Sequence, residues 1–142
     1  MQLTRRDLGA IAAGAAVMAA LPRLALASES NGFEQAIMDF TGGVEPAEGD
    51  VTLGTPEIAE NGNTVPIEVS APGAAAIMVL STGNPNPGIV TFEFSELSGE
   101  RTGSTRIRLA KTQDLIAVAK MEDGSFTMAK RQVKVTIGGC GG

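Results

Sequence analysis

The sequence contains no histidine, no tryptophan and no tyrosine, and its single cysteine is Cys140. Histidine is the side chain that most often binds transition metals and most often acts as a general base near neutral pH. A lone cysteine cannot form an internal disulfide, and it cannot supply a CxxC pair for zinc or redox chemistry. These absences disfavour a metalloenzyme, a histidine-dependent hydrolase and a thiol peroxidase that needs a resolving cysteine.

Basic residues are also scarce. The chain has 11 Lys and Arg residues against 16 Asp and Glu residues, which gives a formal net charge of −5 at pH 7. A chain this acidic lacks the basic surface to which nucleic acids and anionic lipids bind, so we expect no nucleic-acid partner. Its only aromatic residues are five phenylalanines, so a hydrophobic core must be mainly aliphatic.

Residues 1–27 have the features of a cleavable signal peptide. Arg5 and Arg6 form a twin-arginine pair, an apolar stretch follows them, and Ala25 and Ala27 supply the small residues that a signal peptidase recognises. The apolar stretch is shorter than the roughly 20 residues that span a bilayer, which favours a signal peptide over a membrane anchor or a buried helix. The sequence therefore predicts export to the periplasm by the twin-arginine pathway, with no membrane anchor.

Residues 28–137 are predicted to form one all-β domain with a short N-terminal helix at residues 28–40. In that helix, apolar residues recur at helical spacing and a pair of glycines follows. From residue 51 onward, apolar and polar residues alternate with period two, and turn residues recur every eight to twelve positions. About seven short strands of this kind predict an antiparallel β-sandwich of immunoglobulin-like type.

Three details of the strands can be predicted. Pro66 cannot donate to a sheet ladder, so its strand is expected at an edge. Residues 115–121 are apolar on both faces, as in a central strand. In the last strand, which should hold Ile137 in the sandwich, the apolar positions change parity; this predicts a β-bulge near residues 129–132.

The C-terminal residues 138–142 place the thiol of Cys140 between two pairs of glycines, which are Gly138, Gly139, Gly141 and Gly142. Glycine reaches nearly all of backbone space, so this sequence predicts a flexible arm that can deliver a thiol into another protein's active site. An enzyme's own nucleophile would need a base and an orienting group in fixed geometry. The sequence therefore predicts a carrier of covalent cargo rather than a catalyst.

Other interpretations of Cys140 remain open. The cysteine could form an interchain disulfide that only fastens a structural immunoglobulin-like module to another chain, or it could be accidental. An exposed thiol without a use is costly in an oxidising compartment because it is readily oxidised, which counts against an accident. Prenylation requires a cysteine fourth from the end, whereas Cys140 is third.

Four stretches resemble one family, SoxY, the sulfur-carrier subunit of the periplasmic sulfur-oxidising (Sox) system. They are TIGGCGG at residues 136–142, GNPNPG at 83–88, STRIRLAKTQ at 104–113 and PEIAENGNTVPIEV at 56–69. The resemblance covers essentially the whole chain after the signal peptide. It implies an immunoglobulin-like sandwich in a heterodimer with a SoxZ-like subunit, with oxidised sulfur carried on Cys140.

The resemblance also implies transient partners. A c-type haem enzyme would couple thiosulfate to the thiol, and a manganese-dependent hydrolase would release sulfate. A molybdenum-containing dehydrogenase, where present, would oxidise the remaining sulfur. The carrier itself is expected to bind no metal, haem or other cofactor.

Three other features have an ordinary structural interpretation. The basic residues Arg101, Arg106, Arg108 and Lys111 are expected on a solvated strand face, with a partner-docking surface as the alternative. Three methionines, Met78, Met121 and Met128, are expected in the core rather than at a copper site. Residues 84–87 (NPNP) are expected to form a rigid turn.

Overall fold

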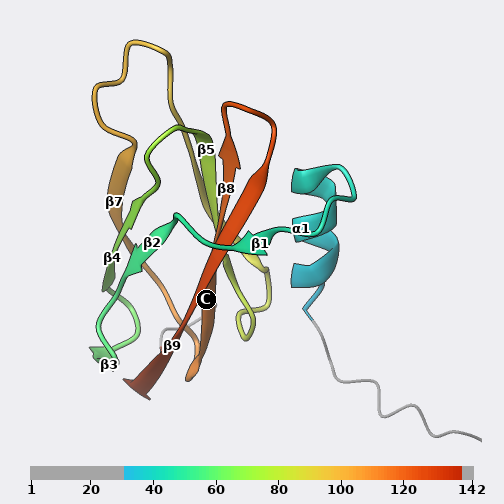
Figure 1. The fold of residues 1–142 in the computed structure, drawn as a ribbon. Coiled ribbons are helices and arrows are strands. Elements are labelled where there is room, and N and C mark those ends of the chain that lie inside the picture. Colours follow the sequence, from blue (N-terminus) through green and yellow to red (C-terminus); the bar gives the residue numbers. More distant parts are fainter. Residues whose placement is uncertain (1–30, 139–142) are drawn as a thin grey trace, which may run out of the picture.

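The structure is a computed structural model, and residues 31–138 are described. One helix and nine strands form three layers, in the order small sheet, large sheet and helix (Figure 1). The elements are α1 (Phe33–Thr41), β1 (Ala47–Glu48), β2 (Thr52–Gly54), β3 (Ile58–Asn61), β4 (Val65–Ser70), β5 (Ala74–Ser81), β6 (Gly88–Glu93), β7 (Thr102–Ile107), β8 (Gln113–Met121) and β9 (Phe126–Ile137).

The larger sheet has six strands in the order β1-β9-β8-β5-β6, with β3 also paired to β9. The smaller sheet has three strands in the order β2-β4-β7. All long pairings are antiparallel, and only the short strands β1 and β3 pair with β9 in parallel. The predicted immunoglobulin-like β-sandwich is confirmed. The sequence pattern did not reveal β1 and β3, because strands of two and four residues are too short to show an alternation.

The main core lies between the two sheets. Ile67 of β4 is 3% exposed, and Ile77 of β5 and Leu115 of β8 are fully buried. Successive side chains of a strand point to opposite faces of the sheet, so Ile116, which follows Leu115 in β8, points away from this core. Both faces of β8 are buried and it pairs with β5 and β9, so the predicted central strand is confirmed.

A second, smaller core lies between the large sheet and α1. Its fully or nearly buried members come from β5 and β8: Leu80, Ile116 and Val118. The apolar side of α1 packs against them through Phe33, Ala36, Ile37 and Phe40. The predicted helix and its apolar stripe are confirmed from Phe33 onward, and the earlier part of the predicted range lies outside the described residues. Gly42, with a φ of 66°, ends the helix.

The predicted bulge in the last strand is wrong. The register between β8 and β9 runs without a shift from Gln113↔Val133 to Lys120↔Phe126. The apolar positions change parity because β9 contributes to both cores in turn. Its first half faces the helix, where the rings of Phe126 and Phe40 lie 6.1 Å apart, and its second half turns Val133 into the core between the sheets.

The predicted edge position of the Pro66 strand is also wrong, since β4 lies between β2 and β7. Pro66 is accommodated because β2 is short. That strand ends at Gly54, which pairs with Glu68, so it does not extend as far as Pro66. The proline faces a partner only on the β7 side, where it is opposite Arg106. At Pro66, β4 therefore has a neighbouring strand on one side only, and the proline, which cannot donate a backbone hydrogen bond, is tolerated there.

Candidate functional site

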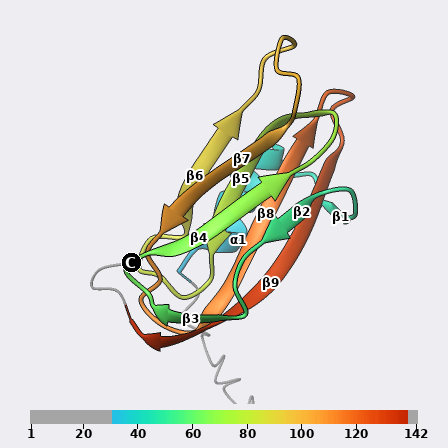
Figure 2. The same cartoon turned by 90° about the vertical axis from the view of Figure 1, so that its left-hand side faces the viewer.

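The last strand carries the chain out of the sandwich toward the cysteine. Side-chain exposure along its core-facing side increases step by step, from fully buried Val133 through half-buried Val135 to Ile137, which is 66% exposed. The expectation that Ile137 is held in the sandwich is therefore wrong for its side chain, because β9 extends beyond the core. Figure 2 shows the end of β9 beside β3 at the lower end of the sandwich, away from the loop between β6 and β7.

Hydrogen bonds fix the final residues of β9 on both sides. On the β3 side, the Lys134 amide donates to the Glu57 carbonyl at 2.9 Å. On the β8 side, the Val135 amide donates to Thr112 Oγ1 at 2.9 Å, and that hydroxyl lies 3.4 Å from the Val135 carbonyl. The Gly62 amide donates to the Ile137 carbonyl at 2.7 Å. The strand therefore stays anchored up to its last residue.

Gly138, the next residue, is exposed and lies against the backbone of Ala110. A Cβ on Gly138 would overlap the carbonyl oxygen of Ala110 and come within 3.1 Å of its carbonyl carbon. We call Gly62, Ala110 and Thr112 the arm seat, because they contact the chain where it leaves β9. All three lie in loops or turns beside the end of the sandwich.

A buried amide cluster holds the loop that contains Ala110. Asn84 is 3% exposed, donates from Nδ2 to the Arg108 carbonyl at 2.8 Å, and accepts at Oδ1 from the Ala110 amide at 3.0 Å. Gln113, 6% exposed, donates from Nε2 to Asn84 Oδ1 at 2.8 Å and to the Lys111 carbonyl at 3.0 Å. The predicted rigid turn at residues 84–87 therefore also supports the neighbouring loop. Sequence reasoning did not identify this connection.

The remaining predicted site residues lie outside the described range. They are Gly139, Cys140, Gly141 and Gly142 of the arm, and Arg5, Arg6, Ala25 and Ala27 of the signal peptide. Within residues 31–138, no three or more His, Cys, Asp or Glu side chains converge on a metal position. No helix in that same part of the chain is long and apolar enough to cross a membrane.

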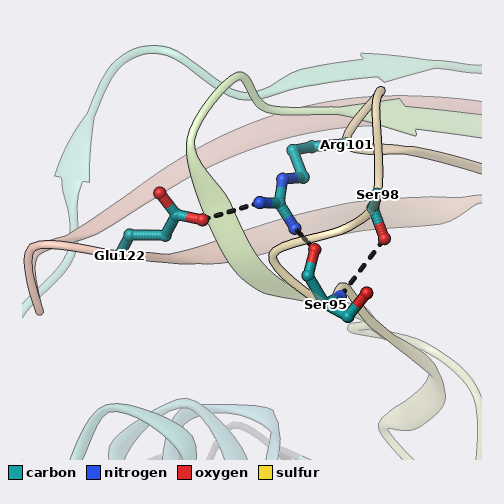
Figure 3. Close-up of polar contacts among 4 residues, drawn as sticks. All are labelled: Ser95, Ser98, Arg101 and Glu122. Carbon is teal, nitrogen blue, oxygen red and sulfur yellow. Dashed lines mark hydrogen bonds and ion pairs between the residues drawn. The ribbon is translucent and has the colours of Figure 1, made fainter.

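The basic stretch does not form one solvated face. Arg106, Arg108 and Lys111 are exposed as expected. Arg101 is not, since its side chain is 11% exposed and forms an ion pair of 2.6 Å with Glu122 (Figure 3). Its guanidinium also donates to the Ser95 carbonyl and lies 6.0 Å from the centre of the Phe94 ring. Arg101 thus fastens the loop between β6 and β7 to the end of β8.

The expected core positions of the methionines are confirmed. Met78 and Met128 pack against the helix-side core, and Met121 packs against the core between the sheets. All three are half-buried. Their side chains fill the outer parts of the two cores, which is the usual use of this flexible residue.

Comparison with protein families identifies the chain. A family model described as "Sulfur oxidation protein SoxY" matches residues 37–140, a range that covers most of the chain and includes Cys140. The chain belongs to the SoxY family. The structure of the sulfur carrier protein SoxY from Chlorobium limicola f thiosulfatophilum is similar to it, with 34% identity and a TM-score of 0.64. That match covers 71% of this chain and 89% of the Chlorobium protein.

More distant matches support the fold alone. A superoxide reductase (neelaredoxin) from Ignicoccus hospitalis matches with a TM-score of 0.55 and 15% identity, over 61% of this chain and 80% of that one. The hypothetical protein PH1083 from Pyrococcus horikoshii matches with a TM-score of 0.53 and 16% identity, over 68% and 99% of the two chains. No curated protein matches the chain. The family match and the Chlorobium structure, rather than these distant matches, confirm the resemblance to SoxY as membership of a family of sulfur-oxidation carriers.

Proposed function

We propose that this protein carries sulfur covalently on Cys140 during the oxidation of thiosulfate or related reduced sulfur compounds. The observation that carries the proposal is the SoxY family match, which extends to the only thiol in the chain. The anchored end of β9 supports it. The strand directs the chain out at an exposed end of the sandwich, and Ile137 and Gly138 are both exposed there.

Loading the carrier is an oxidation that the chain cannot perform alone. The thiol of Cys140 and thiosulfate form a sulfur–sulfur bond, with release of one proton and two electrons, and the product is a cysteine-bound thiosulfate with one negative charge. The two electrons would be accepted by a c-type haem partner, one electron for each haem iron that is reduced. Because the thiolate is the nucleophile and an ordinary thiol is mostly protonated at neutral pH, the partner must also activate Cys140.

Unloading then proceeds on further partners. Hydrolysis of the bond to the terminal sulfonate consumes one water, releases sulfate and two protons, and leaves a persulfide anion on Cys140. This step suits a manganese-dependent hydrolase, since a metal-bound water is a strong nucleophile at neutral pH. A molybdenum-containing dehydrogenase, where present, oxidises the persulfide sulfur. The protein in this scheme is a substrate carrier and needs no cofactor of its own.

The sandwich is proposed to pair with a SoxZ-like subunit in the periplasm. The twin-arginine motif at Arg5 and Arg6 supports export of an already folded chain. A leaderless partner could cross the membrane while bound to it. The pairing is expected to rest on the faces or edges of the sandwich rather than on a disulfide, because Cys140 is needed for cargo.

Replacement of Cys140 by serine tests the function. In a strain that lacks the wild-type protein, the Cys140→Ser protein should fold, bind its partner subunit and fail to support thiosulfate oxidation. Normal thiosulfate oxidation in that strain would refute the proposal. If the variant loses its partner, and reducing agent separates the wild-type pair, Cys140 serves as an interchain disulfide instead.

A further inference from the structure

We propose that Gly138 is a positioning residue, and that its contact with Ala110 fixes the point from which Cys140 is presented to partner enzymes. This inference rests on the proposed carrier function. The evidence for this inference is the close approach of Gly138 to the backbone of Ala110 in the arm seat.

Glycine is required at position 138 because there is no room for a Cβ atom. The atoms that a Cβ would meet belong to the backbone of Ala110, so no rotation of a side chain can relieve the overlap. Other glycines serve a different purpose: Gly42 and Gly124 have φ values of 66° and 86°, and a Cβ at either would meet nothing within 4 Å. Gly138 has no such positive φ. Any other residue at this position therefore requires the end of β9, the loop at Ala110 or both to shift.

The loop at Ala110 cannot easily move back. Asn84 holds it from the interior through the Arg108 carbonyl and the Ala110 amide. Leu109 is fully buried, and its amide donates to the Gly62 carbonyl at 2.7 Å. Asn84 and Leu109 thus hold the backbone of Ala110 in place, and Gly138 lies against the carbonyl of that residue.

The same elements hold β9. Gly62 connects the two sides, since its carbonyl accepts from Leu109 and its amide donates to the Ile137 carbonyl. Thr112 binds the Val135 amide from the other side. The anchoring therefore reaches Gly138, the last residue that the structure describes, and Cys140 follows two residues later in the sequence. At ~3.3–3.6 Å per residue, the Cα of Cys140 stays within about 7 Å of Gly138. A partner enzyme would meet the thiol within a small volume beside the arm seat.

The test compares Gly138→Ala with Gly139→Ala, which adds the same methyl group one residue later. Hydrogen exchange of the Gly62 and Val135 amides should become about fivefold faster in Gly138→Ala, because losing such a hydrogen bond costs about 1 kcal/mol. Gly139→Ala and the wild-type protein should exchange alike at both amides. Equal exchange in all three proteins would overturn the anchoring.

A second readout addresses positioning. Sulfur loading is assayed in periplasmic extract of thiosulfate-grown cells that lack the wild-type carrier, with the purified carrier as the varied substrate. Gly138→Ala should lower kcat/KM by about tenfold more than Gly139→Ala, because small displacements of a reacting group are costly. Alkylation of Cys140 by iodoacetamide should stay within about twofold of the wild-type rate, since the thiol itself is unchanged. Equal loading by the two alanine variants would overturn the proposal.

Thr112 supplies variants that add no bulk to the arm. Thr112→Val removes the hydroxyl that binds Val135, and Thr112→Ser keeps it. Thr112 is exposed, so neither change should unfold the protein. Hydrogen exchange at the Val135 amide should be faster, and sulfur loading slower, in Thr112→Val than in the wild-type protein. Both should return to the wild-type values in Thr112→Ser, and identical behaviour of the two variants would contradict the proposal. If the wild-type thiol is never loaded, the proposed function fails, and exchange at Gly62 and Val135 still decides whether Gly138 is an anchor.

Discussion

Replacement of Asn84 by alanine should destabilise the protein strongly, although the residue lies in a surface turn. The side chain is 3% exposed and makes three hydrogen bonds, to the Arg108 carbonyl and from the amide groups of Ala110 and Gln113. A buried group that loses its partner costs about 1–3 kcal/mol. We expect a total loss of about 3–5 kcal/mol, which is a large part of the about 5–15 kcal/mol by which a domain is stable.

The matched control is Asn86→Ala, in the same turn. Asn86 is exposed, and only its backbone carbonyl takes part in a hydrogen bond, from Ser81 Oγ at 3.5 Å. Its replacement should change the free energy of unfolding by no more than about 0.5 kcal/mol. Urea unfolding is followed by far-ultraviolet circular dichroism, since the chain has no tryptophan or tyrosine for fluorescence. If Asn84→Ala is no less stable than Asn86→Ala, the proposed role of the amide cluster is wrong.

Three further predictions address other parts of the sandwich. Leu80→Ala should cost about 2–5 kcal/mol by opening a cavity under α1, whereas Met38→Ala, at a helix position that is 45% exposed, should be nearly neutral in the same urea assay. Arg101→Ala should lower the free energy of unfolding by about 1–2 kcal/mol, and Glu122→Gln by less, because Glu122 is the exposed member of the pair. The pKa of Asp123 is lowered, first by the Ser125 hydroxyl and then by the Ser125 amide. Its stabilising effect should therefore be present above its ordinary pKa and be lost as the pH falls through the lowered value, so Tm values of Asp123→Asn and wild-type protein should converge in acid.

Much of the fold could be predicted because it depends on local patterns. Period-two alternation identified the long strands, and helical spacing from Phe33 to Phe40 identified α1 and its buried side. The incorrect details all depend on what lies opposite a residue. The parity change in β9 looked like a bulge because the pattern does not show that α1 covers one half of the strand. Pro66 appeared to need an edge because the early end of β2 cannot be read from the sequence.

The candidate site was predictable only in its chemistry. A single cysteine between glycines indicates a thiol carrier, since the sequence lacks histidine, the commonest transition-metal ligand and general base, and lacks a second cysteine. The arm seat could not be predicted, because Gly62, Ala110 and Thr112 meet the end of β9 only through tertiary contacts. The requirement for glycine at residue 138 likewise depends on the Ala110 carbonyl, and the sequence alone suggested only flexibility there.

The central claim is that sulfur is bound covalently to Cys140. The direct measurement is mass spectrometry, under non-reducing conditions, of the protein isolated from cells that are oxidising thiosulfate, followed by mapping of the C-terminal peptide. We predict mass increments on Cys140 that correspond to a persulfide, a sulfonate or a bound thiosulfate, and their removal by a reducing agent wherever the link is a sulfur–sulfur bond. Only unmodified thiol on Cys140 during active oxidation, or a Cys140 found solely in a disulfide with another chain, would contradict the account.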